Sequence, residues 1–347
     1  MSKLTRGTLP PRIAAVVCLV LLLATAVYSQ GSVSLVGAGS NVPSPLYALW
    51  TDEFNKKNQG ITVRYLSRST VQGIQDLSRG SGDFAAGEVP LSEEQMHGGT
   101  VHLTSIPSVI VALVPVYNVP GKPQLRFSGK LLSEIFLGSV KTWKDPRIAK
   151  LNPGVSLPDL PVKVVHRTSG KGSNYIFTEF LSKTDPEWKS KVGTSPSPVW
   201  PVGDEANRGE DMIAKVAAAE GAIGYVEASF ARHSELGYGE VENGSGEFVR
   251  ATPATIAAAC EAAEKGMRDD FRISMTSVAG KDAFPISSFT WLYLPESGLT
   301  PERSKALKQF LNWALSEGQE IARTQGYAAL PPSIVNKARA RVNSLLQ

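Results

Sequence analysis

The chain has 347 residues, of which 42% are hydrophobic and 20% are charged, with a formal net charge of +4. This is ordinary globular composition, and the length suggests two lobes or domains of roughly 100–200 residues each. Three of the 36 basic residues and none of the 32 acidic ones lie in the first thirty residues, which leaves 33 against 32 and a net charge of +1. The charge therefore gives no reason to expect nucleic acid as a partner.

The N-terminal segment has the pattern of an export signal. Lys3, Arg6 and Arg12 precede the apolar run IAAVVCLVLLLATAV at 13–27, in which ATA offers a small-residue cleavage signal. This run of fifteen residues is shorter than the roughly 20 that a transmembrane helix needs. We expect residues 1–30 to be a signal peptide, and an uncleaved N-terminal anchor is the alternative.

Beyond this segment, strand-like and helix-like stretches alternate, which predicts an α/β fold. In chain order the sequence predicts a strand at 33–38, a helix at 41–57, a strand at 61–66, a helix at 71–80, a short strand before Glu88 and a buried strand at 107–118. The pattern continues with a helix at 128–138, a strand at 160–166, a helix at 173–183, helix, turn and strand over 210–231, an Ala-rich helix at 255–266, a strand at 284–294 and a last long helix within 301–327.

Three of these strands end in a polar turn that leads into a helix, at 37–42, 67–71 and 167–174. Ligands of open α/β sheets bind at the carboxyl ends of the strands, where such turns gather. A helix start also offers unpaired N–H groups and the positive end of the helix dipole. The turn in VVHRTSGKGSNYIFTEFL (164–181) adds Arg167 and Lys171 with no acid nearby. It is typical of an anion site, and a capped helix with a solvated loop is the alternative.

Glu88 is the one acid that follows a predicted strand beside these turns. A carboxylate can accept a hydrogen bond from a protonated oxyanion such as hydrogen phosphate, and it repels a fully deprotonated one such as sulfate. Glu88 is thus a candidate selectivity residue, and a solvated loop glutamate is the alternative. The candidate donors beside the backbone amides are Ser40, Asn41, Ser69, Thr70, Arg167, Lys171 and Ser173.

Enzyme signatures are scarce. The sequence contains neither G-x-S-x-G nor H-E-x-x-H, and SGKGS fails as a P-loop because Val165 stands where the first glycine is needed. The four histidines, at 97, 102, 166 and 233, do not have the spacing of a metal site, so we expect surface or structural roles. Cys260 remains as the single cysteine once Cys18 leaves with the signal, and we expect a small buried residue without a disulfide. We expect no cofactor or metal.

Six ordered segments carry a resemblance to a known family. They are GAGSNVPSPLYALW, GDFAAGEVPLS, LLSEIFLGSVKTWKDPRIAKLNPG, VVHRTSGKGSNYIFTEFL, GAIGYVEASFA and DAFPISSFTW. Together they resemble the periplasmic phosphate-binding proteins of ABC phosphate transporters. The resemblance implies a two-lobed periplasmic-binding-protein fold with a hinge and one phosphate in the cleft between the lobes. It also implies a discontinuous lobe 1 (31–108 plus 286–347) and a lobe 2 (109–285).

The resemblance further implies which residues bind phosphate. It assigns Asn41 and the backbone of Val42 from the first turn (37–42), Thr70 from the serine turn (67–71), the acid Glu88, and Arg167. The loop after the arginine adds Lys171, Gly172 and Ser173. Ser40, Arg68 and Ser69 are further candidates.

Several positions depart from the family pattern. The family usually has Thr at Asn41, Ser at Thr70, Asp at Glu88 and Ser at Lys171. The acid that restrains the family's arginine is Ser169 here, and Arg68 with Lys171 adds cations. If both cations reach the cleft, the site is more positive than in the family. The segment 203–212 is also less glycine-rich than the family's matching loop, which puts that lobe contact in doubt.

The leading hypothesis is an exported, periplasmic, monomeric protein without catalytic activity. It would capture inorganic phosphate and deliver it to the permease and ATPase of an ABC transporter in the inner membrane. The second hypothesis keeps the fold and changes the ligand to another oxyanion or a phosphorylated small molecule. The third is a secreted phosphatase, which needs a nucleophile or a metal that the sequence does not offer.

Overall fold

The protein is described by a computed structural model that covers residues 32–98 and 101–346. The predicted signal peptide lies outside the described residues. Within them, no helix combines the length and the apolar character needed to cross a membrane.

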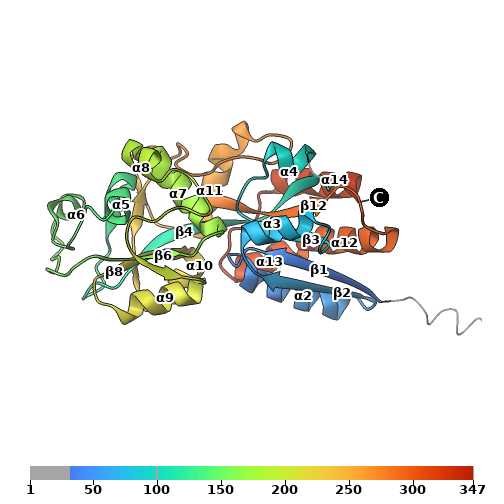
Figure 1. Cartoon of the computed structure of the whole chain (residues 1–347), viewed down its shortest axis with the longest axis horizontal. Coiled ribbons are helices and arrows are strands. Elements are labelled where there is room, and N and C mark those ends of the chain that lie inside the picture. Colours follow the sequence, from blue (N-terminus) through green and yellow to red (C-terminus); the bar gives the residue numbers. More distant parts are fainter. Residues whose placement is uncertain (1–31, 99–100, 347) are drawn as a thin grey trace, which may run out of the picture.

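The two halves of the molecule share one long strand, β4 (Leu103–Tyr117), whose fifteen residues are all buried. Its first part pairs antiparallel with β12, from Leu103–Pro295 to Ala112–Ser287, and its last part pairs antiparallel with β8, from Leu113–Glu227 to Tyr117–Ile223. Figure 1 shows the two resulting groups of elements on either side of β4. The fold is α/β and two-lobed, as predicted from the sequence.

The sheet has the strand order β2-β1-β3-β12-β4-β8-β6-β7, with β9 also paired to β4, and a second sheet has the order β11-β10-β5. β1 pairs parallel with β2 and β3, and β6 pairs parallel with β7 and β8. In each lobe, the carboxyl ends of these parallel strands therefore face the same edge. The strands are β1 (Val33–Gly39), β2 (Ile61–Ser67), β3 (Phe84–Gly87), β4, β5 (Arg126–Phe127), β6 (Lys163–Arg167), β7 (Asp204–Ala206), β8 (Ala222–Glu227), β9 (Gly237–Tyr238), β10 (Glu240–Glu242), β11 (Phe248–Val249) and β12 (Ser287–Pro295).

Helices cover both faces of the sheet (Figure 1). α2 packs on β2, α3 on β3, α12 on β1, and α9 on β8 and β6. The helices are α2 (Ser44–Lys57), α3 (Thr70–Ser78), α4 (Glu93–His97), α5 (Gly129–Phe136), α6 (Pro146–Leu151), α7 (Gly172–Thr184), α8 (Pro186–Lys191), α9 (Gly209–Ala218), α10 (Ala228–Arg232), α11 (Pro253–Ala263), α12 (Pro301–Ala314), α13 (Glu317–Thr324) and α14 (Pro332–Leu345), with a 3₁₀ turn at Glu264–Gly266.

The predicted last helix within 301–327 was wrong, because two helices occupy this stretch and a third follows. α12 ends at Ala314 and α13 starts at Glu317. α14 starts on Pro332, where a proline costs no hydrogen bond, and buries Ile334, Ala338 and Val342 at a spacing of four residues. The sequence alone shows this spacing.

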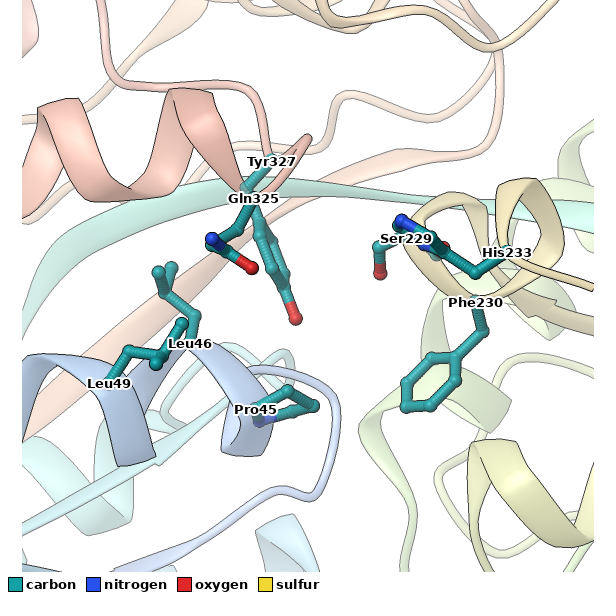
Figure 2. A pocket seen from close by; sticks show the side chains of 8 residues that line it. All are labelled: Pro45, Leu46, Leu49, Ser229, Phe230, His233, Gln325 and Tyr327. Atoms are coloured by element: carbon teal, nitrogen blue, oxygen red, sulfur yellow. The ribbon is translucent and has the colours of Figure 1, made fainter.

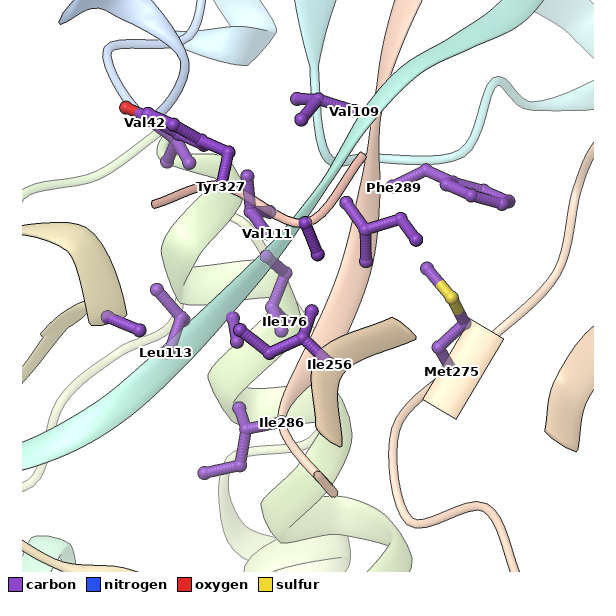
Figure 3. Close-up of a cluster of buried hydrophobic side chains, with 14 of the residues drawn as sticks. Val42, Val109, Val111, Leu113, Ile176, Ile256, Met275, Ile286, Phe289 and Tyr327 are labelled. Atoms are coloured by element: carbon purple, nitrogen blue, oxygen red, sulfur yellow. The ribbon is translucent and has the colours of Figure 1, made fainter. Parts of the chain in front are cut away.

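The core continues from one lobe to the other along β4. Apolar side chains from β4, α7, α11 and β12 gather around this strand, among them Val111, Ile176, Ile256 and Phe289 (Figure 3). Cys260 belongs to the same core and is fully buried, as predicted. This continuous packing fixes where the strands of each lobe end, and so where the loops that follow them meet.

Candidate functional site

The three predicted turns meet between the lobes. Asn41, after β1, accepts a hydrogen bond from Nη2 of Arg167, after β6, at 3.0 Å through its Oδ1. The amide of Val71, in the serine turn, donates to the carbonyl of Gly170 in the arginine loop at 3.3 Å. The loops after β1, β2 and β6 therefore form one site.

Close backbone approach in this site depends on glycine. Gly39 ends β1 with φ +147°, and a Cβ there would lie 2.1 Å from the carbonyl oxygen of Ala86. A Cβ on Gly172 would lie 2.0 Å from Oε2 of Glu88. Gly172 is the first residue of α7, so the N-terminus of this helix lies directly against the Glu88 carboxylate of the other lobe. At Gly39 a side chain would force the backbone to shift, and at Gly172 it would displace the side chains of Glu88 and Thr70.

Glu88 lies at the centre of a group of hydroxyl donors from the first lobe. Its side chain is fully buried. Oε2 accepts hydrogen bonds from Ser40 at 2.7 Å and from Thr70 at 3.3 Å, and Oε1 accepts one from Thr290 at 2.9 Å. Burial raises the pKa of Glu88 to about 7, although the hydroxyls of Ser40, Thr290 and Thr70 act in the opposite direction. This carboxyl group therefore changes its charge near neutral pH.

Arg167 enters the site from the second lobe, next to Asn41. It is the last residue of β6, and its guanidinium is fully buried. Its Nη2 is taken by Asn41, while Nε and Nη1 have no hydrogen-bond partner in residues 32–98 and 101–346. The hydroxyl of Ser173 is also buried and has no hydrogen-bond partner within the part of the chain that the structure describes. Buried donors of this kind are costly unless a ligand or water accepts from them.

Lys171 adds a second cation on the same loop. Its Nζ donates to Oδ1 of Asn207 at 2.8 Å, and the side chain is buried. Burial, followed by the positive charges of Arg167 and Arg208, lowers the pKa of Lys171 to about 8. Lys171 is also the N-cap residue of α7 and makes no side-chain cap hydrogen bond, so its side chain does not occupy the N–H groups of the first turn.

Other predicted residues lie less directly in this cluster. The amide of Val42 donates to Ser40 Oγ at 3.1 Å, and Ser69 caps α3 by accepting from the amide of Gln72. Arg68 pairs with Asp76 at 3.3 Å and is half exposed, so its charge is balanced outside the cleft. Ser169, where the family has an acid, is exposed.

Three residues were missed by sequence reasoning. Thr290 comes from β12, Asn207 from the segment 203–212, and Glu227 from the end of β8. The carbonyl oxygen of Asn207 accepts from Asn41 at 3.1 Å, so this segment does make a contact between the lobes. Glu227 lies 3.9 Å from Nη1 of Arg167. Thr290 and Glu227 are part of apolar strand segments with no local signature; Thr290 lies within β12, and Glu227 is the last residue of β8.

The structure also has a separate hollow of about 260 Å³ (Figure 2). It is bordered by α2, α10 and the segment around Tyr327, and its lining is mostly apolar. The lining includes no lysine or arginine, which makes it unsuited to an anion. The charged cluster around Arg167 is therefore the candidate site.

Comparisons with known proteins identify the family of the chain. The family model of the PBP superfamily domain matches residues 26–318. A phosphate-binding protein PstS from Pasteurella multocida is 33% identical over 325 residues, which covers 93% of this chain and 94% of that protein. One from Haemophilus influenzae is 34% identical over 326 residues, covering 93% and 96%. The chain belongs to the phosphate-binding protein family.

Solved structures support the fold of this family member. A putative phosphate ABC transporter substrate-binding protein from Clostridium perfringens, solved with bound phosphate, has a TM-score of 0.63 at 18% identity over 86% of this chain and 100% of that one. The high-affinity periplasmic phosphate-binding protein PfluDING has a TM-score of 0.70 at 17% identity over 88% and 93%. At these identities the similarity concerns the fold, which is the two-lobed fold expected from the sequence.

Proposed function

We propose that the protein is a solute-binding protein that captures inorganic phosphate between its lobes and delivers it to an ABC transporter. The proposal rests on two kinds of buried group in one site. Arg167 and Ser173 have donors without a partner within residues 32–98 and 101–346, and Glu88 is a buried acceptor. Hydrogen phosphate needs both kinds of group, because it has oxyanions to accept from donors and one proton to donate. The relatives named phosphate-binding protein support the same ligand.

The phosphate ligands would come from both lobes. The first lobe would contribute Glu88 and the hydroxyl groups around it, and the second lobe the arginine loop and the start of α7. Binding would then draw the lobes together, since neither lobe holds the complete set. We assign the ligand set to Asn41, Val42, Thr70, Glu88, Arg167, Lys171, Gly172 and Ser173, with Ser40 and Ser69 as supporting residues.

Burial of the site favours inorganic phosphate over a phosphorylated small molecule. The side chains of Arg167, Glu88 and Thr70 are fully buried, and that of Ser173 is 1% exposed. A phosphate ester would have to pass its organic group between lobes that already touch at Asn41 and Gly170. An anion without a substituent fits without opening this contact.

The remaining features follow from the same proposal. The protein would be exported by its N-terminal segment, act in the periplasm as a monomer, and meet the permease and ATPase complex at the inner membrane. Lobe 1 would comprise 31–108 and 286–347, and lobe 2 would comprise 109–285. A substrate-binding role requires no catalysis, and the related proteins are named for binding.

Titration calorimetry on protein stripped of phosphate tests the function. Phosphate and arsenate should bind tightly, because both carry a proton near neutral pH, and sulfate should bind at least a hundredfold more weakly, since an unmatched buried acceptor costs a few kcal/mol. Sulfate binding as tight as phosphate would remove the role proposed for Glu88. Tight binding of a phosphomonoester with weak binding of phosphate would favour the second hypothesis.

A further inference from the structure

Glu227 is a buried carboxylate behind Arg167. It is the last residue of β8, which pairs parallel with β6, so Glu227 and Arg167 lie at the same edge of the sheet. Its side chain is 3% exposed, and its Oε2 is 3.9 Å from Nη1 of Arg167. Across the described residues, neither carboxylate oxygen has a hydrogen-bond partner outside Glu227 itself. A buried acid with no such partner needs an electrostatic reason to be there.

The surroundings of Glu227 favour its charged form in part. Gly209, the first residue of α9, lies so close that a Cβ on it would be 3.1 Å from Oε2 of Glu227. The carboxylate therefore lies against the positive end of this helix. Burial raises the pKa of Glu227, Arg167 lowers it, and the acid Glu210 raises it. Arg167 and the start of α9 thus offset only part of the cost of burying the acid, whose pKa remains raised.

The arginine loop provides no other acid for Arg167. Ser169 is a neutral, exposed residue, and the next loop residues up to Gly172 include no carboxylate. Glu88, on the other lobe, is already occupied by three hydroxyl donors. Glu227 is the acid that forms an ion pair with Arg167 in the residues the structure covers.

We propose that Glu227 is the internal counter-ion of Arg167, which balances the guanidinium before the anion arrives and weakens anion binding afterwards. The proposal rests on the proposed function for its second half, because it takes phosphate as the anion at Arg167. Glu227 acts through the arginine and does not touch the ligand, so it is a positioning and affinity-setting residue.

The substitution E227Q separates this role from a merely structural one. It keeps the shape of the side chain and removes its charge. Without the counter-ion, the unliganded protein contains an uncompensated buried arginine and should unfold a few degrees lower. Phosphate should bind about tenfold more tightly, a fraction of the attraction between two charges at an effective dielectric constant of about 20. A structural role would lower stability and weaken binding together.

E134Q is the matched control. Glu134 lies in the same lobe with Oε2 3.5 Å from Nη1 of Arg147, and neither residue belongs to the phosphate cluster. This variant should leave the phosphate dissociation constant unchanged. Both variants would be compared with the wild type by calorimetry with phosphate and by thermal unfolding in phosphate-free buffer. Unchanged or weaker phosphate binding by folded E227Q would overturn the proposal.

A second comparison needs no ligand. In an R167M background the carboxylate has no arginine to balance, so adding E227Q should no longer lower the melting temperature. An equal loss in both backgrounds would refute the counter-ion role. If E227Q alone does not fold, folding of the R167M/E227Q protein supports the pairing and its failure to fold contradicts it. A wild type that binds no phosphate would sink the proposed function, whereas this comparison would still test the ion pair.

Discussion

The protonation of Glu88 should make the stability of the unliganded protein depend on pH in an unusual direction. The carboxyl group is fully buried, and burial raises its pKa from the ordinary value of 4.5 to about 7. The native state therefore holds this proton more tightly than the unfolded state does. Replacing Glu88 with Gln removes the titration and keeps the side-chain volume.

The magnitude follows from the pKa difference. Between pH 4.5 and 7 the native protein binds more protons at this group than the unfolded chain, so the free energy of unfolding falls as the pH rises and levels off above about 7. One pKa unit corresponds to about 1.4 kcal/mol, so Glu88 contributes a loss of about 3 kcal/mol over this range. Glu227, whose pKa burial also raises, acts in the same direction in both proteins. The difference between wild type and E88Q therefore isolates Glu88.

Urea unfolding in phosphate-free buffers from pH 4.5 to 8 measures this difference. The wild type should lose about 3 kcal/mol more than E88Q over the range, and E134Q, which replaces a glutamate outside the cleft, should retain the wild-type slope. Equal slopes for wild type and E88Q would refute the reasoning. They would mean that the carboxylate is solvated in the unliganded protein, as in the surface-loop alternative.

Three further substitutions test individual contacts of the site. Arg167→Ala should weaken phosphate binding by several kcal/mol in calorimetry, the usual cost of truncating one member of a buried charged pair, and an unchanged dissociation constant would mean that this loop does not bind the anion. Gly172→Ala places a Cβ 2.0 Å from Oε2 of Glu88, so phosphate affinity should fall at least about tenfold with an unchanged circular dichroism spectrum; wild-type affinity would contradict the contact between α7 and Glu88. Lys171 has a pKa lowered by burial to about 8, and a bound anion favours its charged form, so wild-type affinity should fall more steeply from pH 7.5 to 9 than that of Lys171→Ser. Parallel pH profiles would show that Nζ does not face the anion.

Much of the fold could be predicted from local sequence patterns. The strands at 33–38 and 61–66 and the helix at 41–57 have clear apolar periodicity, and the structure has them within a few residues as β1, β2 and α2. α10 was not separated from β8, because its five residues, Ala228–Arg232, are too few to show a helical periodicity. A short helix held by tertiary contacts leaves little trace in periodicity.

The candidate site could be predicted only where polar residues interrupt an apolar pattern. Arg167, Lys171 and Ser173 form such an interruption, as do Ser40 and Thr70. Thr290 and Glu227 lie within strands that are buried throughout, so their neighbours in the sequence suggest core positions. Their role depends on which strands lie side by side, and strand order is a property of the whole fold.

Under the proposed function, the hydrogen bonds of Glu88 account for the selection of a protonated anion over a fully deprotonated one. An ionised carboxylate has about four acceptor positions. The hydroxyls of Ser40, Thr70 and Thr290 occupy three of them, and all three belong to the first lobe. One acceptor position of the carboxylate then remains for a hydrogen-bond donor in the cleft. Hydrogen phosphate would accept hydrogen bonds from Arg167 through its charged oxygens and donate its proton to Glu88, so it would satisfy groups of both lobes. A fully deprotonated anion would leave the last acceptor position of Glu88 without a donor, and its charge would repel the carboxylate.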